Sequence, residues 1–223
     1  SGFRINRAGD DAAGLAISES MRSQINGLNQ AAKNADDAIG LIQTAEGALT
    51  ETHSMLQRLK TLATQGANGT YDDTARGNIN KEITDLNAEI DRIAESTSFN
   101  GVTPLKQNTK FTFQIGATKD EVLKFDCKVT MDSTGLKIND ITVDDTAAAN
   151  GAITKIDAAI NSVSAYRAEL GAKQNRLEHT VNNLNVTAEN ITAAESRIRD
   201  TDMADEMTAF TKNNILSQAA QSM

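Results

Sequence analysis

The stretch from residue 153 to residue 198 reads ITKIDAAINSVSAYRAELGAKQNRLEHTVNNLNVTAENITAAESRI and has the clearest periodicity in the chain. Counted from Ile153 in alternating steps of three and four, eleven of fourteen positions are apolar. Residues at that spacing form one stripe along a helix, as in the seam of a coiled coil. We therefore predict a single long helix that packs through this seam against another long helix.

A second run of the same kind supplies the partner helix. Between residues 21 and 56, nine of the eleven positions met by the same steps are apolar. Asp10 and Asp11 stand where an N-cap and a first-turn acid belong, and the glycine-rich turn at residues 66–69 ends the pattern. The helix would contain roughly 57 residues and measure about 85 Å at about 1.5 Å per residue.

Two shorter elements lie between the long helices. Residues 73–95 carry isoleucines and leucines on one face, which predicts a helix that doubles back on the first. Farther on, the period drops to two on both sides of the turn GATKDE, which predicts a β-hairpin with one apolar face. The apolar positions of this hairpin are Phe111, Phe113, Ile115, Leu123, Phe125, Cys127 and Val129. Cys127 is then a small buried hydrophobe.

The fold class that follows is mainly α, an elongated rod of long antiparallel coiled-coil-like helices with a small β-hairpin subdomain. Residues 1–98 and 147–223 form the N-terminal and C-terminal parts of one discontinuous rod domain. Residues 99–146 form the hairpin subdomain and its connections. A break at RDTDMADE leads into a last helix, from Met203 to the end of the chain at Met223.

Composition and charge exclude several classes of partner. The 223 residues contain no Trp and few other aromatic residues, which favours elongated helical packing over a thick core. The net charge is −8 and the pI is near 4.8, so nucleic acid and anionic membranes are unsuitable partners. The sequence contains no run of 18 consecutive apolar residues that could span a bilayer.

The sequence offers little catalytic chemistry. His53 and His179 lie in separate helices outside any H-E-x-x-H motif, and the sequence has neither a phosphate-binding glycine loop nor a nucleophile elbow. A single cysteine excludes an internal disulfide. Asn-x-Thr sequons begin at Asn68, Asn185 and Asn190, and we interpret them as chance matches because two lie within the long helix. We expect no enzyme activity, no metal and no cofactor.

The two helical ends carry long motifs that resemble bacterial flagellin, the filament subunit. The N-terminal motifs are SGFRINRAGDDAAGLAISESMRSQINGL, IQTAEGALTETHSMLQRLKTLATQ and EIDRIAESTSFNGV, within residues 1–102. The C-terminal motif is RAELGAKQNRLEHTVNNLNVTAENITAAESRIRDTDMADEMTAFTKNNILSQAAQSM, residues 167–223. Only residues 103–150 carry little of the family's signature.

The resemblance implies a self-assembling structural subunit of a secreted, extracellular motility filament. Its implied partners are other flagellin subunits, a flagellar secretion chaperone and the filament cap. In flagellins, segments that flank a rod like this one pair in the filament core. We therefore expect residues 1–223 alone not to polymerise.

The resemblance also implies recognition by the innate receptor Toll-like receptor 5. Receptor-active flagellins carry a pattern like Q-R-x-R-E-L-x-x-Q, and later an E-I pair; here the stretches read QRLKTLATQ and NINKEIT, with departures at Lys60 and Thr61. The implied receptor-binding residues are Gln57, Arg58, Leu62, Gln65, Ile79 and Glu82. From the residues alone a second interpretation stays open, in which Leu62 packs on the returning helix and Arg58 is a solvated flank residue.

Two other functions compete with the filament subunit. A hook–filament junction protein of the same superfamily shares the helical ends, although the motif LEHTVNNLNVTAENITAAESRIRDTDMADE favours flagellin. A cytosolic coiled-coil scaffold explains the heptads and leaves the motifs unexplained.

Overall fold

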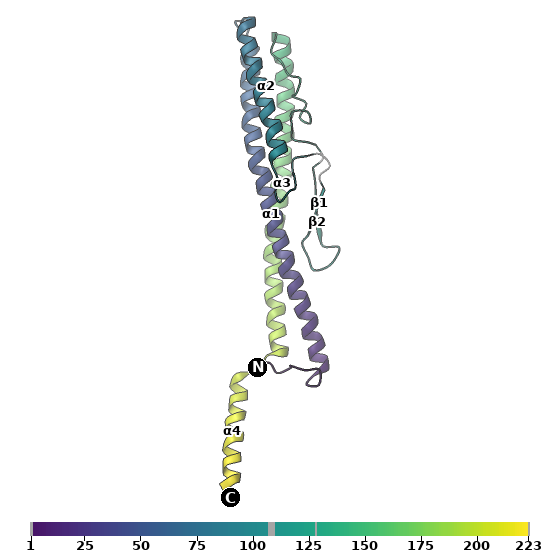
Figure 1. Cartoon of the computed structure of the whole chain (residues 1–223), viewed down its shortest axis with the longest axis vertical. Coiled ribbons are helices and arrows are strands. Elements are labelled where there is room, and N and C mark those ends of the chain that lie inside the picture. Colours follow the sequence, from purple (N-terminus) through teal and green to yellow (C-terminus); the bar gives the residue numbers. More distant parts are fainter. Residues whose placement is uncertain (1, 107–109, 128, 223) are drawn as a thin grey trace.

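The computed structural model describes residues 2–106, 110–127 and 129–222 of the chain. Within these residues it contains four helices and one two-stranded sheet. Figure 1 shows α1 and α3 side by side along a rod, with α2 beside their upper part, the hairpin beside the middle and α4 projecting below. The elements are α1 (Ala12–Gly66), α2 (Asp73–Ser96), β1 (Lys110–Gln114), β2 (Val122–Asp126), α3 (Thr146–Arg199) and α4 (Met203–Ser222). The mainly helical rod is therefore confirmed.

Capping aspartates set where the long helices begin. The Asp11 carboxylate accepts a hydrogen bond from the Gly14 amide at 2.9 Å, and the Asp145 carboxylate accepts one from the Ala148 amide at 2.6 Å. Such caps satisfy amides that have no partner within the helix. Asp145 explains why α3 begins ahead of Ile153, where the apolar period starts. With 55 residues, α1 is about 80 Å long at about 1.5 Å per residue.

The core of the rod follows the predicted seams. Many leucines and β-branched residues at seam positions of α1 and α3 are fully buried, and others are partly buried at the edge of the core. The fully buried ones include Leu49, Leu56, Ile156, Val163, Leu170 and Leu177. The polar seam residues lie at its edge, where Arg167 on α3 approaches Glu46 on α1 at 3.6 Å. His53 is half-buried and its Nε2 lies 3.0 Å from Gln57 Nε2. These polar positions therefore interrupt the apolar seam without breaking either helix.

A buried arginine closes the turn between α1 and α2. The side chain of Arg76 is 6% exposed and donates to the backbone carbonyl oxygens of Gly66, Asn68, Tyr71 and Val143. Carbonyls at the C-terminal end of a helix have no intrahelical partner, so a cation placed there is favourable. Arg76 therefore links the end of α1 to the start of α2 and to the segment before α3.

The hairpin agrees with the predicted alternation over its strands. The strands pair antiparallel, with Phe111 opposite Phe125 and Phe113 opposite Leu123. Cys127 is fully buried just after β2, as predicted. The prediction was wrong for Val129, which is 42% exposed, because β2 ends at Asp126 and the alternation does not continue past it.

Irregular backbone between residues 129 and 145 completes the core. Its apolar side chains are buried in the same cluster as the helix seams: Met131, Leu136, Ile138, Ile141 and Val143. Polar contacts fix the segment, since Asn87 Nδ2 donates to the Ile138 carbonyl and Asp91 accepts from the Ser133 amide and hydroxyl. The periodicity did not predict this packing.

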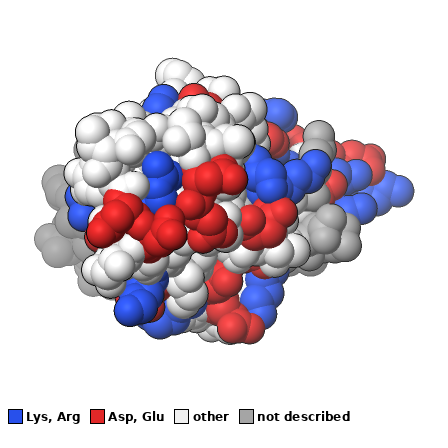
Figure 2. All heavy atoms as spheres, turned by 90° about the horizontal axis from the view of Figure 1, so that it is seen from above, with Lys and Arg blue, Asp and Glu red and all other residues white. Residues whose placement is uncertain are grey.

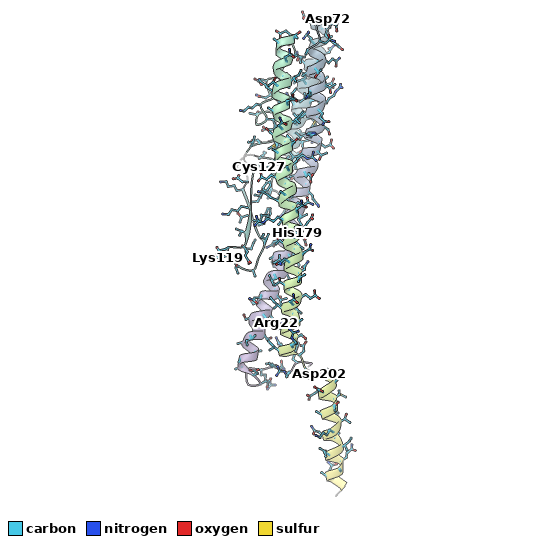
Figure 3. All side chains as sticks on the ribbon, turned by 180° about the vertical axis from the view of Figure 1, so that it is seen from behind. Arg22, Asp72, Lys119, Cys127, His179 and Asp202 are labelled. Atoms are coloured by element: carbon cyan, nitrogen blue, oxygen red, sulfur yellow. The ribbon has the colours of Figure 1, made fainter. Side chains whose placement is uncertain are left out.

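The last helix, α4, stands apart from the core. Its side chains are exposed from Met203 to residue 221, including Met207, Phe210, Ile215 and Leu216. It follows α3 after a short linker in which Asp202 caps α4 (Figure 3). The described helices lack the combination of length and hydropathy that crossing a membrane requires.

Candidate functional site

The residues implied to bind a receptor lie where α1 and α2 run side by side toward the end of the rod. Arg58 on α1 and Glu82 on α2 form an ion pair, with both Nε and Nη2 of Arg58 lying 2.7 Å from Glu82 Oε1. Their side chains are 52% and 43% exposed. The hydrogen bond and the negative charge of Glu82 raise the pKa of Arg58. Two residues that are 24 positions apart in the sequence thus form one exposed charged feature.

Two of the implied residues lie beneath this feature. Leu62 is 1% exposed and Ile79 is 6% exposed, and both belong to the main core cluster. In this structure they offer almost no area to a partner. They hold α1 against the rest of the rod and so fix the position of the Arg58–Glu82 pair.

Gln57 and Gln65 line a groove next to the ion pair. This open groove has a volume of about 520 Å³ and runs along the last turns of α1; its lining residues are Gln57, Lys60, Thr61, Thr64, Gln65, Asn68 and Tyr71. Gln65 Nε2 donates to the hydroxyl of Tyr71 at 2.9 Å, which closes one end. The structure therefore brings together four of the six implied residues as an accessible surface.

The two departures from the family pattern have local roles. Lys60 forms an ion pair with Asp157 on α3 at 2.7 Å, and the Thr61 hydroxyl donates to the Gln57 carbonyl at 3.1 Å. Lys60 is thus directed toward α3, and Thr61 adds no charge to the surface. Figure 2 looks onto this end of the rod, where acidic and basic side chains are interspersed.

Two polar groups buried near the hairpin, the Cys127 thiol and the Tyr166 hydroxyl, are satisfied by backbone carbonyls. The Cys127 thiol donates to the Val129 carbonyl at 3.2 Å, and burial raises its pKa. The Tyr166 hydroxyl donates to the Pro104 carbonyl at 3.2 Å, and burial raises the pKa of this phenol as well. A thiol with a raised pKa is a poor nucleophile at neutral pH. The described residues contain no group of three or more His, Cys, Asp or Glu side chains placed to hold a metal.

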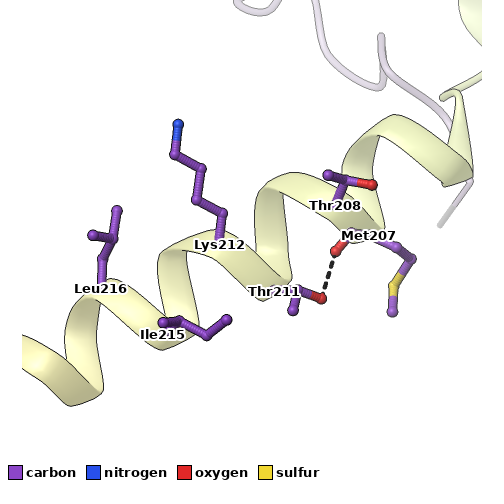
Figure 4. Close-up of a pocket in the computed structure, with 6 residues that line it drawn as sticks. All are labelled: Met207, Thr208, Thr211, Lys212, Ile215 and Leu216. Carbon is purple, nitrogen blue, oxygen red and sulfur yellow. Dashed lines mark hydrogen bonds between the residues drawn. The ribbon is translucent and has the colours of Figure 1, made fainter.

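A second surface that the sequence did not single out as a site lies on α4. An open hollow of about 570 Å³ lies along this helix. The residues that line it, drawn in Figure 4, are Met207, Thr208, Thr211, Lys212, Ile215 and Leu216. The Thr211 hydroxyl donates to the Met207 carbonyl at 2.8 Å, so its polar atom is already satisfied. The sequence predicted this helix, but it did not show that α4 leaves the rod.

Comparison with known proteins accounts for both helical halves of the rod. Residues 1–110 match the family model described as the bacterial flagellin N-terminal helical region, and residues 153–223 match the bacterial flagellin C-terminal helical region. The flagellin of Bacillus subtilis (strain 168) is 50% identical over 258 residues, covering 100% of this chain and 84% of the relative. The flagellin of Halalkalibacterium halodurans is 52% identical over 228 residues, covering 100% of this chain and 83% of the relative.

A solved structure agrees with the fold. The crystal structure of Bacillus cereus flagellin has a TM-score of 0.62 and 33% sequence identity, covering 73% of this chain and 94% of that one. The flagellin relatives cover the whole chain, so the motifs, the paired helices and the hairpin have one explanation. The sequence identity of 50% and 52% to these two flagellins favours the filament subunit over the junction protein and the cytosolic scaffold. The chain belongs to the bacterial flagellin family and is a structural, non-enzymatic subunit of the extracellular flagellar filament.

Proposed function

We propose that this flagellin is also a ligand of Toll-like receptor 5, and that Gln57, Arg58, Gln65 and Glu82 make the contact. The observation that carries the proposal is the exposed Arg58–Glu82 pair, which α1 and α2 hold on one face. Gln57 and Gln65 lie along the adjoining groove.

The physical chemistry of the pair suits an interface. An exposed ion pair contributes only about 0–1 kcal/mol to folding, so a partner can rearrange it at little cost. A guanidinium offers five donors in a planar fork and is a frequent anchor at interface centres. Because buried Leu62 and Ile79 fix the backbone below, the surface needs little reordering on binding.

Surface plasmon resonance against the receptor ectodomain tests this proposal. Replacing Arg58 or Glu82 with Ala should weaken binding at least about tenfold, the loss typical of an interface anchor. The matched control is Arg92→Ala, because Arg92 also forms an exposed ion pair with a glutamate, Glu89, on α2. Equal affinities for the parent, Arg58→Ala and Glu82→Ala would remove the pair from the binding site.

The family implies self-assembly into a filament, and we propose further copies of flagellin, the secretion chaperone and the filament cap as specific partners. The exposed apolar side chains of α4 support this proposal, since Met207, Phe210, Ile215 and Leu216 are each more than half exposed. Apolar area of this kind is stabilised when a partner covers it.

A pull-down of the purified chaperone by the chain and by its Phe210→Asp variant tests the α4 contact. The variant should capture much less chaperone. Equal capture would show that α4 takes no part in that contact.

A further inference from the structure

The turn between α1 and α2 contains a dipeptide with its own chemistry, Asn68–Gly69. In an Asn–Gly sequence the glycine amide nitrogen can attack the asparagine side chain, because no β-carbon hinders it. The chain has four such dipeptides, beginning at Asn26, Asn68, Asn100 and Asn150. Their surroundings differ, so the structure distinguishes them.

Two of the four dipeptides are held within helices. Asn26 lies in α1 and Asn150 lies in α3, where the amide of the following glycine is part of the helical hydrogen-bond ladder. A nitrogen held in this ladder must first be released by local opening of the helix. Reaction at these two positions is therefore slow while the chain is folded.

Asn100 lies in a tight turn. Its φ is +49°, and the turn is closed by reciprocal hydrogen bonds between Phe99 and Val102 at 2.8 and 3.0 Å. These bonds oppose the rotation that would bring its side-chain carbonyl onto the Gly101 nitrogen.

Asn68 also lies in a turn, where its carbonyl accepts from the Tyr71 amide at 3.4 Å, but its φ is not positive and its side-chain carbonyl is itself engaged. It is exposed and lies outside the helices, and a β-carbon built on Gly69 would meet nothing within 4 Å. Asn68 Oδ1 accepts a hydrogen bond from the Thr70 amide at 3.3 Å, which polarises the side-chain carbonyl. Among the described residues, no hydrogen bond engages the Gly69 amide. The Gly69 nitrogen, which is the nucleophile, is therefore accessible, and the Asn68 side-chain carbonyl that it attacks is polarised.

We propose that Asn68 is a spontaneous deamidation site of the folded flagellin. The Gly69 nitrogen loses its proton and forms a bond to Cγ of Asn68, the Cγ–Nδ2 bond breaks, and ammonia leaves. Water then opens the resulting succinimide at either carbonyl, giving aspartate or isoaspartate. The net change is amide plus water to carboxylate plus ammonium, with no oxidant or reductant.

The product changes the charge and the backbone at this end of the rod. A new carboxylate appears close in sequence to Asp72 and Asp73. In isoaspartate the main chain runs through Cβ and Cγ of residue 68, and the backbone carbonyl of Asn68 that accepts from Arg76 Nη2 at 3.2 Å becomes the free carboxylate. Deamidation therefore acts on the contact that joins α1 to α2.

The test is mass spectrometry of peptides from the folded chain after incubation at mildly alkaline pH. Asn68 should be the fastest of the four, and at least about tenfold faster than Asn26 and Asn150, whose reaction needs local opening. In denaturant the deamidation rates of the four asparagines should become similar, because the folded surroundings that distinguish them are lost. An unmodified Asn68, or any other Asn–Gly that reacts as fast as Asn68 in the folded chain, would overturn the proposal.

Two glycine variants sharpen the test. Gly69→Ala fits the open space and should slow the reaction at Asn68 several-fold, because the new methyl group hinders ring closure. The control is Gly77→Ala on α2, which also has open space and should leave the rate at Asn68 unchanged. An undiminished rate in Gly69→Ala would contradict the mechanism.

Discussion

Truncation of Arg76 should be among the most destabilising single changes in the rod. Arg76→Ala removes a guanidinium that donates to four backbone carbonyls, of which those of Gly66 and Val143 are engaged in a buried setting. A hydrogen bond to a charged group contributes about 1.5–3 kcal/mol, and an orphaned buried acceptor costs about 1–3 kcal/mol. The four bonds share one group and oppose its desolvation, so they do not add in full.

We expect a loss of about 3–4 kcal/mol in the free energy of unfolding for Arg76→Ala. At about 2–4 °C per kcal/mol for a chain of this size, the melting temperature falls by roughly 10 °C. Urea unfolding followed by circular dichroism measures the free energy. The free energy of unfolding of Arg76→Lys should lie between those of Arg76→Ala and the parent chain, because one ammonium group cannot reach all four carbonyls.

The matched control for Arg76 is Arg92→Ala, which removes an arginine from the same helix. Arg92 is 61% exposed and paired with Glu89, so its loss should cost about 0.5 kcal/mol or less. A loss below about 1 kcal/mol for Arg76→Ala would refute the assignment of Arg76 as the residue that closes the turn.

Two further predictions concern the core. Leu177→Ala should cost about 2–5 kcal/mol, because the side chain is fully buried in the seam, whereas Val186→Ala on the exposed side of α3 should change little. Equal unfolding midpoints for the two variants would mean that the seam is misplaced. Stability should also fall at alkaline pH, because burial raises the pKa values of Tyr166 and Cys127 in the folded chain. The unfolded chain releases these protons first, near pH values of about 10 and about 8.5, so the stabilisation is complete below about pH 8 and declines above. Melting temperatures at pH 7 and at about pH 10.5 measure this loss of stability, which should be smaller in Tyr166→Phe. Equal melting temperatures at the two pH values would contradict the prediction.

The sequence predicted the helical elements well because their determinants are local. A seam repeated over tens of residues and a capping side chain such as Asp11 both act within a few residues along the chain. The burial of Cys127 followed from the same kind of pattern, a strand period of two.

The features that were missed depend on distant contacts. Leu136 and Ile138 lie on irregular backbone, where no period marks them as buried, and their burial needs the groove formed by the helices. Arg76 resembles an ordinary surface arginine until the α1 carbonyls are placed beside it. The Arg58–Glu82 pair requires the register between α1 and α2, and that register depends on the length of the turn. For Leu62 the sequence left two interpretations open, a receptor contact and a core position, and only the packing shows that it is buried.

The most direct test of the filament assignment is to exchange this chain for the matching segment of Bacillus subtilis flagellin. The match spans 84% of that relative, which leaves its remaining residues to flank the insert. The chimera would be expressed in a strain that lacks its own flagellin and examined by electron microscopy. A filament subunit predicts long extracellular filaments and restored swimming. A chimera that is secreted with the expected helical content and forms no filaments would contradict the account.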